Sequence, residues 1–87
     1  MRTIYKHQIE ITDEQTVMIH GDSGFPVFLH AGLDPVGRPC LWVEQETTFE
    51  LKPHTIYIVG TGKQMPLKAM VHVGSFVQGR FVWHVYR

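Results

Sequence analysis

Apolar and polar residues alternate with a period of two along much of the chain, which is the pattern of β-strands with one buried face. From Thr3 to Ile11 the odd-numbered residues share one face and the even-numbered residues the other, and Thr16–His20 repeats the pattern. No segment keeps a helical period over more than about ten residues. We expect two strands paired as a hairpin, or a single helical turn between them, since Thr12 followed by Gln15 resembles a capping box.

One stretch breaks the alternation. Ile56 to Val59 is a continuous run of β-branched and aromatic residues, which suits a central strand that is buried on both faces. The run ends at Gly60-Thr61-Gly62, followed by Lys63. Two glycines allow positive φ angles and a close approach of the backbone, and they leave N–H groups free to point at a ligand.

Turn residues predict a second hairpin in the middle of the chain. Asp34–Gly37 separates a strand at 25–33 from a strand at 38–46, and a four-residue turn sets Leu33 opposite Arg38 and Ala31 opposite Cys40. Cys40 is then a core residue. A short strand at 47–52 follows, with Phe49 and Leu51 facing inward, and Pro53 ends it.

A third hairpin is predicted at the end of the chain. Gln78-Gly79 is a two-residue turn between strands at 67–77 and 80–87, which sets Gly74 beneath the indole of Trp83. This pairing also places His72 and His84 on opposite faces. Together these elements predict a single β domain over residues 1–87, an all-β fold built as a small antiparallel sandwich or partly open barrel of seven to eight short strands.

Composition narrows the classes of partner. The 8 basic and 8 acidic residues cancel, which argues against general binding of nucleic acid or of an anionic membrane. Cys40 is the only cysteine, so no intramolecular disulfide forms, and this fits a reducing cytoplasm. The chain opens without a signal-peptide pattern and has no apolar run of the roughly 18 residues that a membrane span needs. A chain of this size has a small core, so we also expect a homo-oligomer.

The residues that could carry chemistry do not form a catalytic pattern. No two of the six histidines are three or four residues apart, and no cysteine pair exists, so we expect no metal site and no cofactor. The candidate nucleophiles Cys40, Ser23 and Ser75 have no recognisable activating neighbours in the sequence. We therefore expect a protein that is not an enzyme.

The Gly60-Thr61-Gly62-Lys63 loop is the best candidate for ligand binding. Its backbone donors, its hydroxyl and its lysine could hold one phosphate-sized anion, with Arg38, Arg80 or Arg87 adding positive charge. The loop is neither a Walker motif nor a dinucleotide fingerprint. The alternative is a plain glycine-rich bend.

The last strand predicts a contact surface. Phe81, Trp83 and Val85 share one face, and Val82, His84 and Tyr86 share the other, so both faces are substantially apolar. Basic residues are not interleaved with these aromatics, so an interface between subunits built from Trp83, Phe81, Tyr86 and His84 explains them better than a platform for single-stranded nucleic acid.

Several short segments in order resemble a known family. They are Ile4-Tyr5-Lys6, Ile11 to Thr16, Pro39 to Trp42, Ile58 to Gly62, Gly74-Ser75-Phe76 and Val82 to Val85. The pattern is similar to a family of small uncharacterised proteins common in tailed-bacteriophage genomes. This chain departs from it at Ser75, where threonine is expected, and at residues 21–28, where the family has a lysine-glycine turn.

The resemblance implies a phage protein that acts in the cytoplasm of a host bacterium, and it supplies no catalytic residues. Small phage accessory proteins of this size often act by binding. We expect a non-catalytic, phage-encoded binding protein that counters a host antiviral defence, by sequestering a nucleotide signal or by blocking a defence protein. The alternative is a structural or assembly accessory protein of the phage particle.

Overall fold

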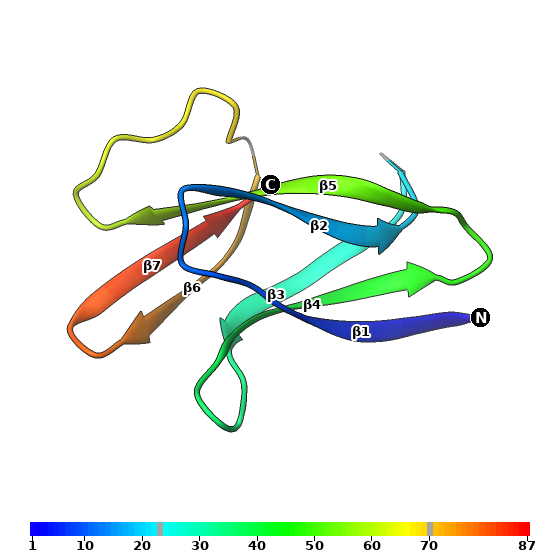
Figure 1. Cartoon of the computed structure of the whole chain (residues 1–87), viewed down its shortest axis with the longest axis horizontal. Helices are drawn as coiled ribbons and strands as arrows, with labels where there is room; N and C mark the ends of the chain where they lie inside the picture. The colour runs from blue at the N-terminus through cyan, green and yellow to red at the C-terminus, as the bar shows by residue number, and fades with distance from the viewer. Residues whose placement is uncertain (23, 70) are drawn as a thin grey trace.

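The chain folds into two antiparallel sheets that face each other as an open sandwich (Figure 1). The computed structural model describes residues 1–22, 24–69 and 71–87. One sheet has three strands in the order β1-β4-β3, and the other has four strands in the order β2-β5-β7-β6. The strands are β1 (Arg2–Gln8), β2 (Glu14–His20), β3 (Val27–Leu33), β4 (Pro39–Glu46), β5 (Leu51–Gly60), β6 (His72–Gln78) and β7 (Phe81–Tyr86). The all-β prediction is confirmed, and the sandwich is open and does not close into a barrel.

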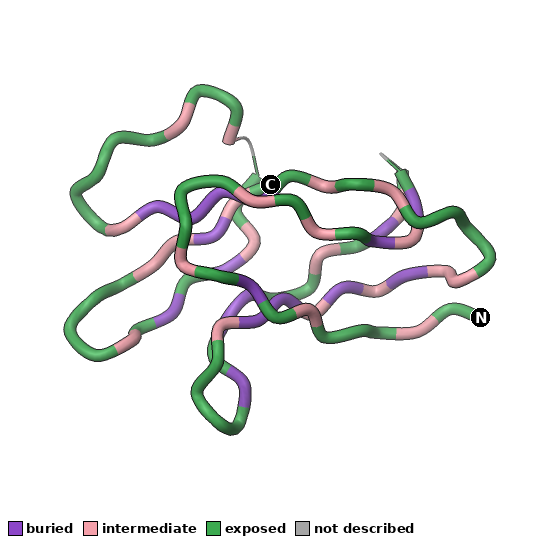
Figure 2. The backbone as a smooth tube through the Cα atoms, in the orientation of Figure 1, coloured by how far each residue is buried: buried purple, intermediate pink, exposed green. Residues whose placement is uncertain are grey.

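The core lies between the sheets and is made mainly of aliphatic side chains from both. Figure 2 marks the buried positions along the backbone. Its fully buried members come mainly from β2, β3, β4, β5 and β7 and are Ile19, Ala31, Leu41, Val43, Ile56 and Val85. From Leu41 to Gln45 on β4, buried positions alternate with more exposed ones, as the period of two predicts.

The two sheets approach most closely at a seam between β3 and β6. A Cβ atom on Gly74 would lie 2.7 Å from the backbone oxygen of Ala31 and 2.8 Å from its nitrogen. Only a residue without a side chain allows this approach. Gly74 therefore closes one side of the sandwich.

The strand β5 is central, as the apolar run predicts. It pairs with β2 along Leu51–Tyr57 and with β7 along Tyr57–Gly60. Residues Ile56 to Val59 are all at least 94% shielded from solvent. Pro53 lies inside this strand and does not end it, because at that point only β2 pairs with β5 and β7 has not begun.

A buried glutamine links the two sheets. The Gln45 side chain on β4 is fully buried, and its Oε1 accepts a hydrogen bond of 3.0 Å from the backbone N–H of His20 on β2. Its Nε2 therefore donates, and it lies 2.7 Å from Nε2 of His7, which must accept. Burial, and secondarily the charge of His20, lowers the pKa of His7 below its usual value.

Several boundaries differ from the sequence predictions. The first two strands do not form a hairpin, because β1 pairs with β4 and β2 pairs with β5 in the other sheet. Residues Thr12–Gln15 contain no helical turn. The predicted strand at 47–52 is a turn that leads into β5, and Phe49 and Leu51 are 47% and 50% exposed. The strand predicted at 67–77 starts only at His72.

The register of the middle hairpin is shifted by one residue. Ala31 opposes Leu41, and Leu33 opposes Pro39. The cause is Gly37, whose φ of +85° lengthens the connection so that Asp34 N–H donates to the Arg38 carbonyl. Cys40 is nevertheless fully buried, as predicted.

The register of the last hairpin is shifted by two residues. Phe76 opposes Trp83, and Gly74 opposes Val85. The turn is Gly79-Arg80, with Gly79 at a φ of +61° in the first central position, as a type II′ turn requires. The predicted indole over Gly74 is wrong, since the indole of Trp83 covers Gly60 instead, where a Cβ would lie 3.2 Å from its ring.

Candidate functional site

The glycine loop predicted from the sequence forms a tight turn at the end of β5. Lys63 N–H donates to the Gly60 carbonyl at 3.1 Å, and Thr61 N–H donates to the Val82 carbonyl at 3.2 Å. Gly62 has a φ of +86°, which any residue with a side chain adopts only with strain. The loop is thus anchored to β7, and Lys63 projects from a defined backbone.

This loop opens onto a hollow of about 240 Å³ on the outer side of the four-stranded sheet. We call it the outer hollow. It is lined by Val59, Gly60, Thr61, Gly62, Lys63, Met65, His84 and Tyr86. The loop and two residues of the predicted interface, His84 and Tyr86, therefore belong to one concave surface.

A chain of hydrogen bonds leads from the outer hollow across β7 to β6. Thr61 Oγ1 lies 2.8 Å from Nε2 of His84, whose Nδ1 lies 2.7 Å from Oγ of Ser75. Ser75 Oγ is also 2.9 Å from Nε2 of His72. We call these four residues the polar relay. Each group can both donate and accept in this arrangement.

The polar relay corrects the prediction that His72 and His84 lie on opposite faces. A register irregularity between His72 and Gly74 brings the His72 ring to the side of Ser75 and His84. It also places two histidines beside Ser75, for which the sequence indicated no activating neighbour. Nothing in the sequence marks this irregularity, so sequence reasoning had no signal for the cluster.

A second and larger hollow, of about 710 Å³, lies on the other side of Gly60 and Lys63. We call it the inner hollow. It is lined by Ile11, Thr12, Asp13, Ile58, Val59, Gly60, Lys63, Gln64, Met65, Pro66, Leu67 and Trp83. Trp83 lines this hollow, and its Nε1 is buried and has no hydrogen-bond partner among the described residues. The surface of the inner hollow is mainly apolar.

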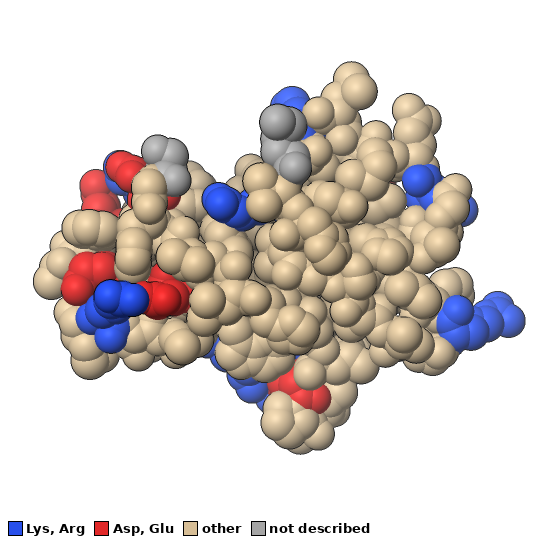
Figure 3. Space-filling model, turned by 180° about the vertical axis from the view of Figure 1, so that it is seen from behind, with Lys and Arg blue, Asp and Glu red and all other residues tan. Residues whose placement is uncertain are grey.

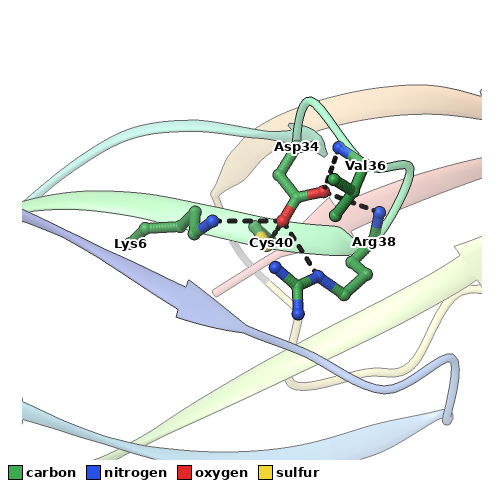
Figure 4. A network of polar contacts seen from close by, with 5 residues as sticks. All are labelled: Lys6, Asp34, Val36, Arg38 and Cys40. Atoms are coloured by element: carbon green, nitrogen blue, oxygen red, sulfur yellow. Dashed lines mark hydrogen bonds and ion pairs between the residues drawn. The ribbon is translucent and has the colours of Figure 1, made fainter.

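The arginines predicted to add charge to the loop are engaged elsewhere. Arg38 Nε lies 3.1 Å from Oδ2 of Asp34 in the turn between β3 and β4 (Figure 4). Arg80 lies over the ring of Phe81 at the β6-β7 turn, and Arg87 lies 4.9 Å from the ring centre of Phe28. None of the three lines the outer hollow. Lys63 is its charged residue.

Asp34 organises the charged groups at the β3-β4 turn. Its carboxylate accepts from the backbone N–H groups of Arg38 and Val36 and pairs with Lys6 Nζ at 3.1 Å (Figure 4). These contacts, with the Arg38 backbone N–H contributing most, hold the pKa of the Asp34 carboxyl well below its usual range. The side chain is 1% exposed, so this cluster supports the fold and offers no open ligand site.

Of the predicted interface residues, Trp83 and Phe81 lie on the inner face of β7, and His84 and Tyr86 lie on its outer face. Trp83 packs against the core and stacks on Phe81 with ring centres 5.6 Å apart. Phe81 is 53% exposed, and His84 and Tyr86 lie on the outer side. The face of the molecule shown in Figure 3 carries its charged side chains toward the margins and is uncharged across its middle.

The other candidate reactive groups do not form a site in the described residues. Within ranges 1–22, 24–69 and 71–87, no three His, Cys, Asp or Glu side chains could hold a metal together. Burial, aided by the nearby charge of Asp34, raises the pKa of the Cys40 thiol, which is unfavourable for a nucleophile. Ser23 lies outside the described residues. In the same described part of the chain, no helix has the length and apolar character to cross a bilayer.

Comparison with known protein families finds a match to one family over the whole chain. Residues 1–87 match a domain of unknown function, DUF7352, and the chain belongs to that family. No curated protein and no solved structure matches it.

Proposed function

We propose that this chain is a non-catalytic binding protein that holds a small phosphate-bearing ligand, such as a nucleotide, in the outer hollow. The observation that carries the proposal is that the Gly60–Lys63 loop shares this hollow with His84 and Tyr86. The loop provides a cation and a hydroxyl, and the β7 residues provide an imidazole and an aromatic ring. These are the groups that a phosphate and an adjoining ring require.

The size of the outer hollow limits the ligand. A volume of about 240 Å³ is below the range of roughly 300–1,000 Å³ that is typical of sites enclosing drug-sized molecules. The site therefore suits a single phosphate with one attached group better than a dinucleotide. The remaining part of a larger ligand would lie on the open sheet beside Tyr86.

The biological setting of the proposal comes from the sequence resemblance. In a phage-encoded protein located in the host bacterial cytoplasm, capture of a nucleotide would sequester a signal of the host antiviral defence. Blocking a defence protein directly is the other form of the same proposal, and it would use the aromatic residues of β7. Both forms require binding and no catalysis.

The first test is binding of nucleotides to the purified protein. Native mass spectrometry and titration calorimetry with a panel of cyclic nucleotides and ADP-ribose derivatives should identify a ligand at integer stoichiometry. Lys63→Ala should weaken its binding by roughly 10- to 100-fold, since a hydrogen bond to a charged group contributes about 1.5–3 kcal/mol and 1.4 kcal/mol is a factor of ten.

Lys68→Ala is the matched control. Lys68 is exposed in the same connection between β5 and β6 and does not line the outer hollow, so its loss should leave affinity within about twofold. Equal losses for both variants would indicate a general charge effect. Full affinity of Lys63→Ala, or no binding across the panel, would contradict the proposal.

The second candidate is a structural or assembly component of the phage particle. Val77 and Val82 pair across β6 and β7 on the outer side and are 61% and 36% exposed, which favours contact between subunits. This function predicts a stable higher oligomer that copurifies with virions. Val82→Lys should dissociate that oligomer and leave the monomer folded; an oligomer that persists in the variant would argue against this surface.

A further inference from the structure

Two proton orders run in one direction along the whole polar relay. A hydroxyl has one proton, and a neutral imidazole has one N–H, so adjacent groups must match donor to acceptor along the whole chain. In the first order, His72 Nε2–H donates to Ser75, Ser75 donates to His84 Nδ1, and His84 Nε2–H donates to Thr61. In the second order every donation is reversed, starting from the Thr61 hydroxyl.

In the absence of a ligand, Thr61 has only a weak acceptor for its hydroxyl proton outside the relay. The first order frees the Thr61 proton to donate out of the relay. The only acceptor for it among the described residues is the Val82 carbonyl, at 3.5 Å, which already accepts the Thr61 backbone N–H. A contact of this length is a weak hydrogen bond. No short hydrogen bond from Thr61 to another described residue therefore favours the first order in the free chain.

An anion in the outer hollow would supply a strong acceptor for that proton. A phosphate oxygen without a proton can only accept, and Thr61 lines the hollow. To bind the anion, Thr61 must donate to it, and His84 must then donate to Thr61. We propose that an anion bound at the Gly60–Lys63 loop selects the first proton order, so that the bound state is transmitted through His84 and Ser75 to His72 on β6.

The inference rests on the proposed function and adds a role for residues that do not touch the ligand. Ser75 and His72 lie outside the lining of the outer hollow and act through His84. In the bound state His72 has its proton on Nε2 and presents Nδ1 as an acceptor. In the second order it presents Nδ1–H as a donor. The chemistry that His72 offers beside Tyr86 therefore reports whether the loop is occupied.

The experiment follows the histidine tautomers directly. The intact chain labelled with ¹⁵N-histidine is titrated with inorganic phosphate, against sodium chloride of the same ionic strength, at a pH where the ¹⁵N shifts show neutral imidazoles. Phosphate should shift both His84 and His72 toward the Nε2–H tautomer, with the same apparent dissociation constant. Sodium chloride should shift neither.

Two variants separate transmission from binding. With Ser75→Ala, His84 should still respond to phosphate and His72 should not. With Thr61→Val, which keeps the side-chain shape, phosphate should bind several-fold more weakly and neither histidine should change tautomer. Backbone amide spectra of both variants establish that the fold is retained.

The outcomes distinguish this inference from the proposed function. If phosphate does not shift the Gly60–Lys63 amides in the wild-type chain, anion binding at the loop fails, and the inference falls with it. If phosphate shifts those amides while the His72 tautomer stays unchanged, the inference alone is overturned. A His72 response that survives Ser75→Ala also overturns it, since the signal would then bypass the relay.

Discussion

Replacing Gly74 tests whether the two sheets meet at the β3-β6 seam. A Cβ at this position would lie 2.7 and 2.8 Å from backbone atoms of Ala31, and real Cβ contacts are not that short. Backbone atoms cannot rotate away as a side chain can, so the strands must separate by several tenths of an ångström. Overpacking of this kind costs about 1–3 kcal/mol. At about 4–8 °C for each kcal/mol in a domain of this size, Gly74→Ala should lower Tm by roughly 4–24 °C.

The assay is urea unfolding followed by tryptophan fluorescence, with thermal unfolding alongside it. The midpoint should fall while the slope m stays constant, because the surface exposed on unfolding is nearly unchanged. Gly24→Ala is the matched control, since its Cβ would meet no atom within 4 Å and its φ is not positive. It should be neutral or slightly stabilising.

A double variant tests whether the clash at Gly74 is with backbone atoms of Ala31 or with its side chain. Ala31→Gly removes only the Cβ contact of 3.2 Å and leaves the two closer backbone contacts in place. Adding it to Gly74→Ala should therefore not restore stability. Wild-type stability of Gly74→Ala, or its rescue by Ala31→Gly, would refute a seam in which backbone meets backbone.

Three further predictions concern the loop and the titrating groups. Gly62→Ala and Gly37→Ala should each lower the free energy of unfolding by about 1–2 kcal/mol, because both glycines have φ near +85° and a Cβ would meet no other atom. Only Gly62→Ala should also weaken ligand binding, as measured by calorimetry. The folded-state pKa of His7 is lowered, so the unfolded chain binds more protons than the folded chain below about pH 6.5. Stability should therefore decline as pH falls through this range. In urea midpoints measured from pH 7 to pH 5, His7→Gln should show a smaller decline. The lowered pKa of Asp34 contributes stability that is present above about pH 4 and is lost at lower pH, so Asp34→Asn should be less stable at pH 7 and less sensitive to acid by circular dichroism.

The fold class follows from local patterns in the sequence, and the hairpin registers do not. The alternating segments indicate strands, and the apolar run at Ile56–Val59 indicates a strand buried on both faces, so the all-β structure and the central strand were predictable. Register depends on which conformation each turn glycine adopts. Gly37 and Gly79 both adopt positive φ angles that extend or displace the turn, and a shift of one or two residues follows.

The candidate site was predictable in one part only. The Gly60–Lys63 loop is marked by its composition and its position after a buried strand. The polar relay depends on the irregularity between His72 and Gly74 and on the two-residue shift of the last hairpin, and neither leaves a mark in the sequence. The charged partners of Arg38 could not be predicted either, since Asp34 becomes buried only when β1 and the β3-β4 turn come together.

Mapping of amide chemical shifts during titration with a nucleotide tests the central claim most directly. The account predicts that the largest shifts cluster at Gly60–Lys63, His84 and Tyr86 and that they saturate with one dissociation constant. Lys63→Ala should raise that dissociation constant roughly 10- to 100-fold, and Lys68→Ala should leave it within about twofold. Saturable shifts confined to the inner hollow or to the β3-β4 turn would place the ligand elsewhere. The absence of any saturable shift would contradict ligand capture by this loop.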